Sequence, residues 1–306
     1  MQKEVKKSWA LFLGIGTMMI AHGLQMQIMG IRSVLEDFSV LTTGVFMSGY
    51  YVGYFIGSKT TPNLVQKVGH IRVFAAFASL ASLSALVAVA YVNPLMWTIS
   101  RFITGISLVS CYVVSESWLN DRANNKNRGQ LLSAYMIVLY FGLALGMLLL
   151  NVSEPEAYEP FILVSVLLSL ALVPILLTKR PAPKFKKIGT ISVKELYEIS
   201  PLGSVSSFAT GMIHAAFFSL ISVYATKAGF TLLETSILLF IATISGVVGQ
   251  GPIGYFSDLY DRRKVIVITT LGGSALAFLS ILSSSDPLQN TYYMDEFALK
   301  KLFFFL

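Results

Sequence analysis

The chain has 306 residues, of which 55% are hydrophobic and 13% charged, with a net charge of +7 at pH 7. A soluble globular protein carries about 25% charged residues, so this chain has too little polar surface to coat a water-soluble particle. Its apolar residues form long blocks rather than the short alternations of a β-barrel, which indicates an all-α membrane protein. The basic residues lie in short loops between these blocks, where membrane topology explains them better than a nucleic-acid surface does.

The chain opens with an apolar run that continues to about Ile31. This run is longer than the core of a signal peptide, so we interpret it as a retained first helix. A membrane-spanning helix needs about 20 mostly apolar residues, and on that basis the sequence predicts about nine of them. Their expected bounds are 9–31, 43–65, 73–92, 95–119, 131–151, 161–178, 202–226, 232–256 and 265–284. Residues 193–199 are expected to form a short surface helix.

Residues able to perform catalytic chemistry are sparse. The single cysteine, Cys111, excludes an intramolecular disulfide and a cysteine metal cluster, and we expect it to be a packing residue. The sequence holds three histidines and no P-loop, HExxH or GxSxG motif. An intramembrane enzyme would need acidic or histidine residues clustered at one depth, and the predicted spans do not contain such a cluster. We therefore predict no enzyme activity, no cofactor and no metal site.

Lysine and arginine are concentrated in alternate connections between the predicted helices. These connections hold Lys3, Lys6, Lys7, Lys59, Lys67, Arg72, Arg122, Lys126, Arg128, Lys179, Arg180, Lys184, Lys186, Lys187, Lys194, Arg262, Arg263 and Lys264. The connections on the other side are poor in basic residues and often acidic. Because basic loops stay on the cytoplasmic side, we predict a multi-pass protein of the cell (inner) membrane with a cytoplasmic N-terminus.

The longest basic connection divides six predicted helices from three. We therefore expect a six-helix N-terminal bundle at 1–178, a cytoplasmic basic linker at 179–201, and an incomplete C-terminal bundle of about three helices at 202–306. Two positions repeat at one offset across the linker: Arg72 aligns with Lys264 and His22 with His214, since 264 − 72 and 214 − 22 both equal 192. The offset indicates two related halves.

Three motifs carry a family resemblance. Residues 254–264 place Gly254 four positions before Asp258, and a basic cluster of Arg262, Arg263 and Lys264 follows. This segment resembles the cytoplasmic-loop signature of the major facilitator superfamily, which joins the second and third helices of each half. Arg101 and Gly105 look like the family's arginine-plus-glycine motif in the fourth helix, and Gly142 with Gly146 resembles its glycine-rich fifth helix.

Glu116-Ser117 and residues 127–136 look like a bacterial subgroup of sugar-transporter-like and proposed efflux members of this family. Two features depart from the family pattern. Gln66 stands where the first-half loop has an acidic residue, which puts its electrostatic latch in doubt. Family members have twelve helices, whereas about nine are predicted here, and residues 300–306 look like the opening of a tenth. We therefore expect a truncated chain, and a monomer if it is full length.

The resemblance implies two bundles that rock about a central cavity, exposing it to one side at a time. On that basis we expect a secondary active transporter that moves a small solute across the plasma membrane, coupled to H⁺. The absence of a nucleotide-binding motif argues against direct ATP drive. Two alternatives stay open at this point: a membrane receptor or scaffold that kept the fold but lost transport, and an inactive fragment of a transporter.

The resemblance also implies a cytoplasmic gate. Asp258 is expected to face the start of the fifth predicted helix, near Arg128, where the helix dipole stabilises a carboxylate by about 0.3–1 kcal/mol. Glu116 is expected to pair with Arg122 or Arg128. The signature loop (Gly254, Arg262, Arg263 and Lys264) and its first-half counterpart (Gly69 and Arg72) complete the gate. Alternatively, the basic residues are topology signals only.

The candidate binding residues are polar groups inside the predicted spans. Arg101 is a cavity arginine that couples to protons or binds an anionic group, or else an arginine that snorkels to the membrane interface. His22 and His214 titrate in a range that suits a coupling proton, or are histidines bonded to nearby backbone. Gln25, Tyr50, Tyr54 and Tyr135 can offer polar groups to a substrate, or serve only in packing.

Overall fold

A computed structural model describes residues 8–123, 128–178 and 192–284, and every regular element in these ranges is helical. The helices are α2 (Trp9–Leu35), α3 (Val40–Val68), α4 (His70–Ala90), α5 (Pro94–Arg122), α6 (Arg128–Leu148), the 3-10 turn η1 (Leu149–Asn151), α7 (Glu159–Leu170), α8 (Leu172–Leu176), α9 (Val193–Ile199), α10 (Pro201–Lys227), α11 (Leu232–Leu259) and α12 (Arg262–Ser284). All nine predicted spans and the short helix are thus found, with the sixth span divided into α7 and α8.

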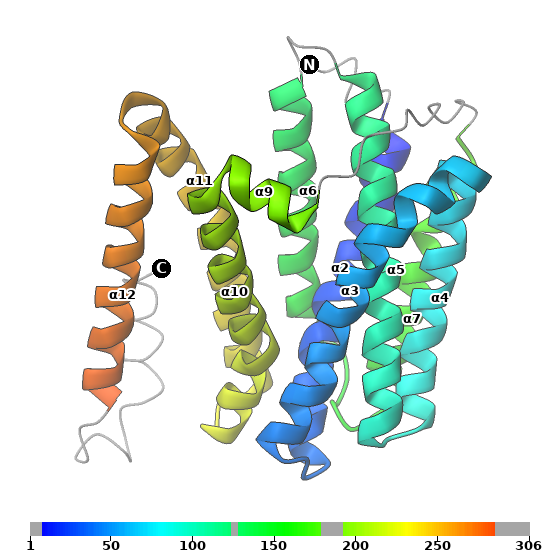
Figure 1. Cartoon of the computed structure of the whole chain (residues 1–306). Coiled ribbons are helices and arrows are strands. Elements are labelled where there is room, and N and C mark those ends of the chain that lie inside the picture. Colours follow the sequence, from blue (N-terminus) through cyan, green and yellow to red (C-terminus); the bar gives the residue numbers. More distant parts are fainter. Residues whose placement is uncertain (1–7, 124–127, 179–191, 285–306) are drawn as a thin grey trace.

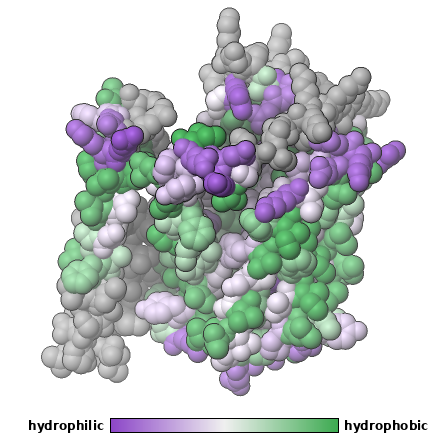
Figure 2. All heavy atoms as spheres, viewed as in Figure 1, coloured by the Kyte–Doolittle hydropathy of each residue, from purple (hydrophilic) through white to green (hydrophobic). Residues whose placement is uncertain are grey.

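The all-α membrane fold is confirmed. Seven helical spans within the described residues are long and apolar enough to cross a membrane, and α3 and α12, at the second and ninth predicted spans, are not among them. For α3 the sequence explains this, because α3 carries glycine, tyrosine and hydroxyl residues where the other spans carry aliphatic ones. Figure 2 shows hydrophobic side chains in a band along the helices and hydrophilic ones gathered at the two ends.

Local sequence signals set the helix boundaries. Asn93 caps α5 by accepting a hydrogen bond from the backbone N–H of Met96 (2.9 Å), and Pro94 occupies the first turn, where its missing N–H costs nothing. Gly69 ends α3 and begins α4 with φ +87°, a conformation that glycine adopts without steric cost. The predicted turn between the second and third spans therefore rests on that glycine.

In Figure 1, helices α2 to α7 stand together as one bundle, and α10 to α12 form a smaller group beside them. Within the bundle α3 packs on α5, α2 on α6, and α4 on α5 and α7. Trp97 lies fully buried in its core and donates from Nε1 to the carbonyl of Ala88 (2.8 Å), with Phe38 and Phe46 edge-on against its ring. The boundaries predicted at 178 and 201 flank residues 179–191, which lie outside the described residues.

Glycines let two helix pairs approach closely. Gly49, Gly53 and Gly57 follow one another at four-residue spacing on the face of α3 that meets α5, and Gly105 faces back from α5. A Cβ at Gly53 would come within 3.0 Å of the carbonyl oxygen of Phe102, a separation that real Cβ atoms essentially never show. Small residues at this spacing are how membrane helices pack backbone to backbone.

Helices α2 and α6 also approach each other closely through glycines, because Gly23 and Gly146 face each other. The glycine-rich fifth predicted helix, which is α6, is therefore a packing surface. Cys111 lies on α5, fully buried, with its Sγ 3.8 Å from the carbonyl oxygen of Phe74 on α4. This agrees with the packing role predicted for the cysteine.

Candidate functional site

A cavity of about 880 Å³ lies where the first bundle meets the smaller group of helices. The first bundle contributes α2, α3, α5 and α6 to its wall, and the other group contributes α10 and α12. The lining residues are Met19, His22, Met26, Tyr50, Tyr51, Tyr54, Tyr112, Met136, Leu139, Tyr140, Leu143, Ser206, Ser207, Thr210, Gly211, His214, Phe218, Ile266, Thr269 and Thr270.

The wall is aromatic and weakly polar. Five tyrosines, three methionines and two histidines line it, and α10 and α12 add serine and threonine hydroxyls. Among these lining residues there is no aspartate, glutamate, lysine or arginine. Such a wall offers ring faces and hydroxyl groups to a small organic molecule.

The glycine face of α3 places the tyrosines. Because Gly49, Gly53 and Gly57 hold one side of α3 against α5, Tyr50 and Tyr54, one turn apart, both reach the cavity. Their ring centroids are 6.0 Å apart, and Tyr54 is 6.3 Å from Tyr112 on α5. Sequence reasoning missed Tyr112 on α5 and Tyr140 on α6. On α3, the four-residue spacing of the glycines was a signal that could have shown which face of the helix packs against α5.

The two histidines aligned by the 192-residue offset line the same cavity from opposite groups of helices. His22 on α2 is 6% exposed and stacks on Tyr50, with ring centroids 5.3 Å apart and planes at 19°. Its Nδ1 has no hydrogen-bond partner among the described residues, so the alternative of a histidine bonded to nearby backbone finds no support at that atom. His214 on α10 is exposed and lies 4.4 Å from the ring of Phe218.

Arg101 is fully buried, so the snorkelling alternative is wrong. Its guanidinium carbon lies 4.8 Å from the centroid of the Tyr50 ring, and its three nitrogens have no hydrogen-bond partner among the described residues. Placing an arginine at the bilayer centre costs at least about 2.5–3.5 kcal/mol. A cation–π contact away from water stabilises the cation by about 2 kcal/mol, so the Tyr50 ring offsets only part of that cost.

Two other candidates lie behind the wall rather than on it. Gln25 is fully buried and donates from Nε2 to the hydroxyl of Thr104 (3.3 Å), which is itself 2.8 Å from the Ser84 hydroxyl. This network joins α2, α4 and α5 behind the cavity. Tyr135 on α6 is 1% exposed, does not line the cavity, and its hydroxyl has no partner among the described residues.

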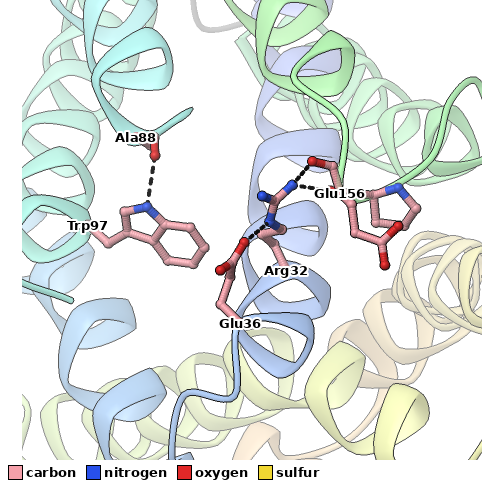
Figure 3. A network of polar contacts seen from close by, with 6 residues as sticks. Arg32, Glu36, Ala88, Trp97 and Glu156 are labelled. Carbon is pink, nitrogen blue, oxygen red and sulfur yellow. Dashed lines mark hydrogen bonds and ion pairs between the residues drawn. The ribbon is translucent and has the colours of Figure 1, made fainter. Parts of the chain in front are cut away.

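Polar contacts gather at the end of the first bundle away from the N-terminus. Arg32, at the end of α2, pairs with Glu36 (2.6 Å) and donates to the carbonyls of Pro155 and Glu156 in the connection before α7 (Figure 3). At the same end α10 packs on α2, and α11 packs on α6 and η1.

A direct polar contact also joins the two groups there, because Asn151 donates to the hydroxyl of Ser236 on α11 (2.7 Å). The cavity-lining residues of α10 lie at 206–218, in its first two thirds, and those of α12 lie at 266–270, in its first half. On α2 and α3 the lining residues at 19–26 and 50–54 lie near the middle of the helix, so the cavity is central along the bundle.

The predicted gate residues of the first half lie at the basic end, without the expected pairing. Glu116 forms no ion pair with Arg122 or Arg128 among the described residues; Arg122 donates to Ser8 (3.2 Å), and Arg128 is exposed. Arg72 is also exposed. Sequence reasoning missed His70, which is buried on α4 with its Nε2 3.0 Å from the hydroxyl of Ser117 on α5.

The second-half loop follows the predicted helix–turn–helix pattern. Gly254 lies exposed in α11, Lys264 is exposed in α12, and the backbone N–H of Arg263 is capped by Asp261 (2.8 Å). The side chains of Asp258 and Arg262 lie outside the described residues, so the latch predicted for Asp258 stays a prediction.

Comparison with known proteins agrees with this architecture. The family model of the Major Facilitator Superfamily matches residues 11–304. The "Uncharacterized MFS-type transporter YcaD" of Escherichia fergusonii is 26% identical over 247 residues, which is 79% of this chain and 65% of that protein. The protein of the same name in Escherichia coli K12 is 26% identical over 250 residues, with the same shares covered. The chain thus spans 65% of the length of these curated relatives.

Solved structures of transporters share the fold. The nucleoside transporter NupG superposes with a TM-score of 0.73 at 12% identity, covering 97% of this chain and 78% of that one. A D-xylose-proton symporter gives 0.69 at 16% identity, with the same shares. A bacterial homologue of the human lysosomal transporter Spinster, in an inward-facing and occupied conformation, gives 0.73 at 13% identity, covering 99% and 73%.

Proposed function

Because the chain belongs to the major facilitator superfamily, we propose that it acts as a secondary active transporter that moves a small solute across the plasma membrane by alternating access. The observation that carries this proposal is the cavity of about 880 Å³, whose wall is shared by the first bundle and the α10–α12 group. A wall divided in this way changes its opening when the two groups rock against each other.

The state of this cycle that we assign rests on contacts between the two groups of helices. At the end away from the N-terminus, Asn151 donates to Ser236 on α11, and Ser222 of α10 lies against Gly30 of α2. If the basic connections are cytoplasmic, as the charge distribution predicts, this conformation is inward-facing. Outward opening would then require the contact between Asn151 and Ser236 to break.

Proton coupling is the second part of the proposal. His22 and His214 line the cavity from the two groups of helices, and no carboxylate lies among the lining residues. An imidazole titrates near pH 6.5, so a histidine exposed alternately to two compartments can accept a proton on one side and release it on the other. Replacement of both histidines by asparagine should then leave solute exchange intact but abolish its response to a pH gradient.

Flux through reconstituted vesicles tests the proposal. The purified chain is placed in liposomes that contain a pH-sensitive dye, and D-xylose, uridine and small carboxylic acids are added under an imposed pH gradient. The first two solutes are chosen because structurally similar proteins are named for a sugar and for nucleosides. Transport predicts solute-dependent acidification or alkalinisation that protein-free liposomes lack.

A matched pair of variants tests whether the solute passes through the cavity. Gly211→Trp places an indole in the cavity, whereas Gly246→Trp places one on α11, away from the lining residues, and both glycines have no atom within 4 Å of a Cβ position. We expect Gly211→Trp to abolish flux and Gly246→Trp to retain it. A folded wild-type chain that moves none of the solutes would favour the non-transporting receptor or scaffold.

A further inference from the structure

Arg101 is a buried positive charge whose counter-ion no described residue supplies. Every carboxylate whose side chain the structure describes lies in a connection or within two turns of a helix end. Glu36 is paired with Arg32, and Glu116 lies 15 residues beyond Arg101 on α5, which is about 22 Å along the helix. No described acidic group is therefore placed to neutralise this guanidinium.

The ring of Tyr50 lies against Arg101 and also lines the cavity. The guanidinium carbon lies 4.8 Å from the centroid of this ring. The backbone that carries Tyr50 is fixed, because the carbonyl of Tyr50 lies directly against Gly105 of α5. A change in the side-chain rotamer of Tyr50 is therefore the smallest movement that would bring the guanidinium closer to the cavity.

The N–H groups of Arg101 are available to donate hydrogen bonds to an anion. Its Nε and both Nη atoms are buried and have no acceptor among the described residues. A guanidinium presents its N–H groups in a planar fork that matches the two oxygens of a carboxylate. The cavity wall beyond Tyr50 carries no carboxylate that would repel such a ligand.

From these observations we propose that the transported solute is an organic acid, and that Arg101 binds its carboxylate once the ring of Tyr50 turns aside. The tyrosine rings and the methionines Met19, Met26 and Met136 then receive the less polar body of the solute. This inference rests on the proposed function, whose solute it assigns to a chemical class.

Binding of matched acid and amide pairs to the purified chain in detergent micelles tests the inference without flux. The pairs are acetate and acetamide, lactate and lactamide, and benzoate and benzamide, observed by saturation-transfer NMR. At least one acid should bind about tenfold more tightly than its amide, as expected for a charge-assisted hydrogen bond. If no acid binds more tightly than its amide, the inference fails.

Variants of Arg101 test whether this residue causes the tighter binding of acids than of their amides. Arg101→Met should abolish the acid preference and Arg101→Lys should retain part of it. Lys59→Met, which removes an exposed charge from α3, should leave it unchanged. If the Arg101 variants do not fold, Tyr50→Ala provides a second test, because removal of the ring should tighten acid binding. An acid preference that survives in Arg101→Met, or an unchanged affinity in Tyr50→Ala, overturns the inference.

The same proteins separate this inference from the proposed function. Acid binding that depends on Arg101, without flux of any acid into vesicles, would refute transport and leave the anion site in place. Flux of D-xylose or uridine without any acid preference would refute the anion site and leave transport in place.

Discussion

Replacement of Gly53 by alanine should separate α3 from α5. The added Cβ would lie within 3.0 Å of the carbonyl oxygen of Phe102, and a backbone atom cannot rotate away as a side chain can. Overpacking of this kind costs about 1–3 kcal/mol, and a clash with backbone belongs near the upper end of that range. The higher helix propensity of alanine raises the stability of the variant by about 1 kcal/mol. The expected net loss of stability is therefore about 2 kcal/mol.

Gly44→Ala on the same helix is the matched control, because a Cβ there meets no atom within 4 Å. It gains the same helix propensity without the clash, so we expect its stability to be unchanged or raised by up to about 1 kcal/mol. The free energy of unfolding is measured by titrating SDS into mixed micelles, with tryptophan fluorescence as the signal. Equal stabilities for the two variants would show that the glycine face does not set the distance between α3 and α5.

Two further outcomes are expected. Trp97→Phe removes the hydrogen bond to Ala88 and leaves a buried carbonyl without its donor, so the free energy of unfolding in the same micelles should fall by about 1–3 kcal/mol; an unchanged value would contradict the bond. At the exposed helix α9, the backbone N–H and the hydroxyl of Ser192 hold the pKa of Glu195 below its usual range. A depressed pKa stabilises the helix above the unfolded pKa and loses that effect as the pH falls through the folded value. The protection of the α9 amides, measured as their exchange rate relative to that of the unfolded chain at the same pH, should therefore fall on acidification, and Glu195→Gln should remove this pH dependence.

The helices were predictable because each apolar block is long and is bounded by charged or turn-forming residues. The break between α7 and α8 was not, since residues 161–178 read as one continuous apolar run. The offset of 192 paired His22 with His214, and both side chains line the same cavity.

The direction in which a side chain points was harder to predict. Gln25 and Arg101 are polar residues inside spans, and composition alone could not tell a cavity wall from the bundle interior behind it. That distinction depends on which helices become neighbours, and a single sequence does not give those pairings. The glycines of α3 indicated one of these pairings, because their spacing marks the side of the helix that meets α5.

The burial of Cys111 has a practical consequence for following this protein in motion. Thiol reagents react with exposed thiolates, and this sulfur is enclosed between α4 and α5. Because it is the chain's single cysteine, the natural sequence already serves as a background for site-specific labelling. Pairs of cysteines introduced at the ends of α2 and α10 can carry spin labels or fluorophores, whose separation should change if the two groups of helices rock as proposed. Conformational exchange can thus be recorded in an otherwise unaltered protein.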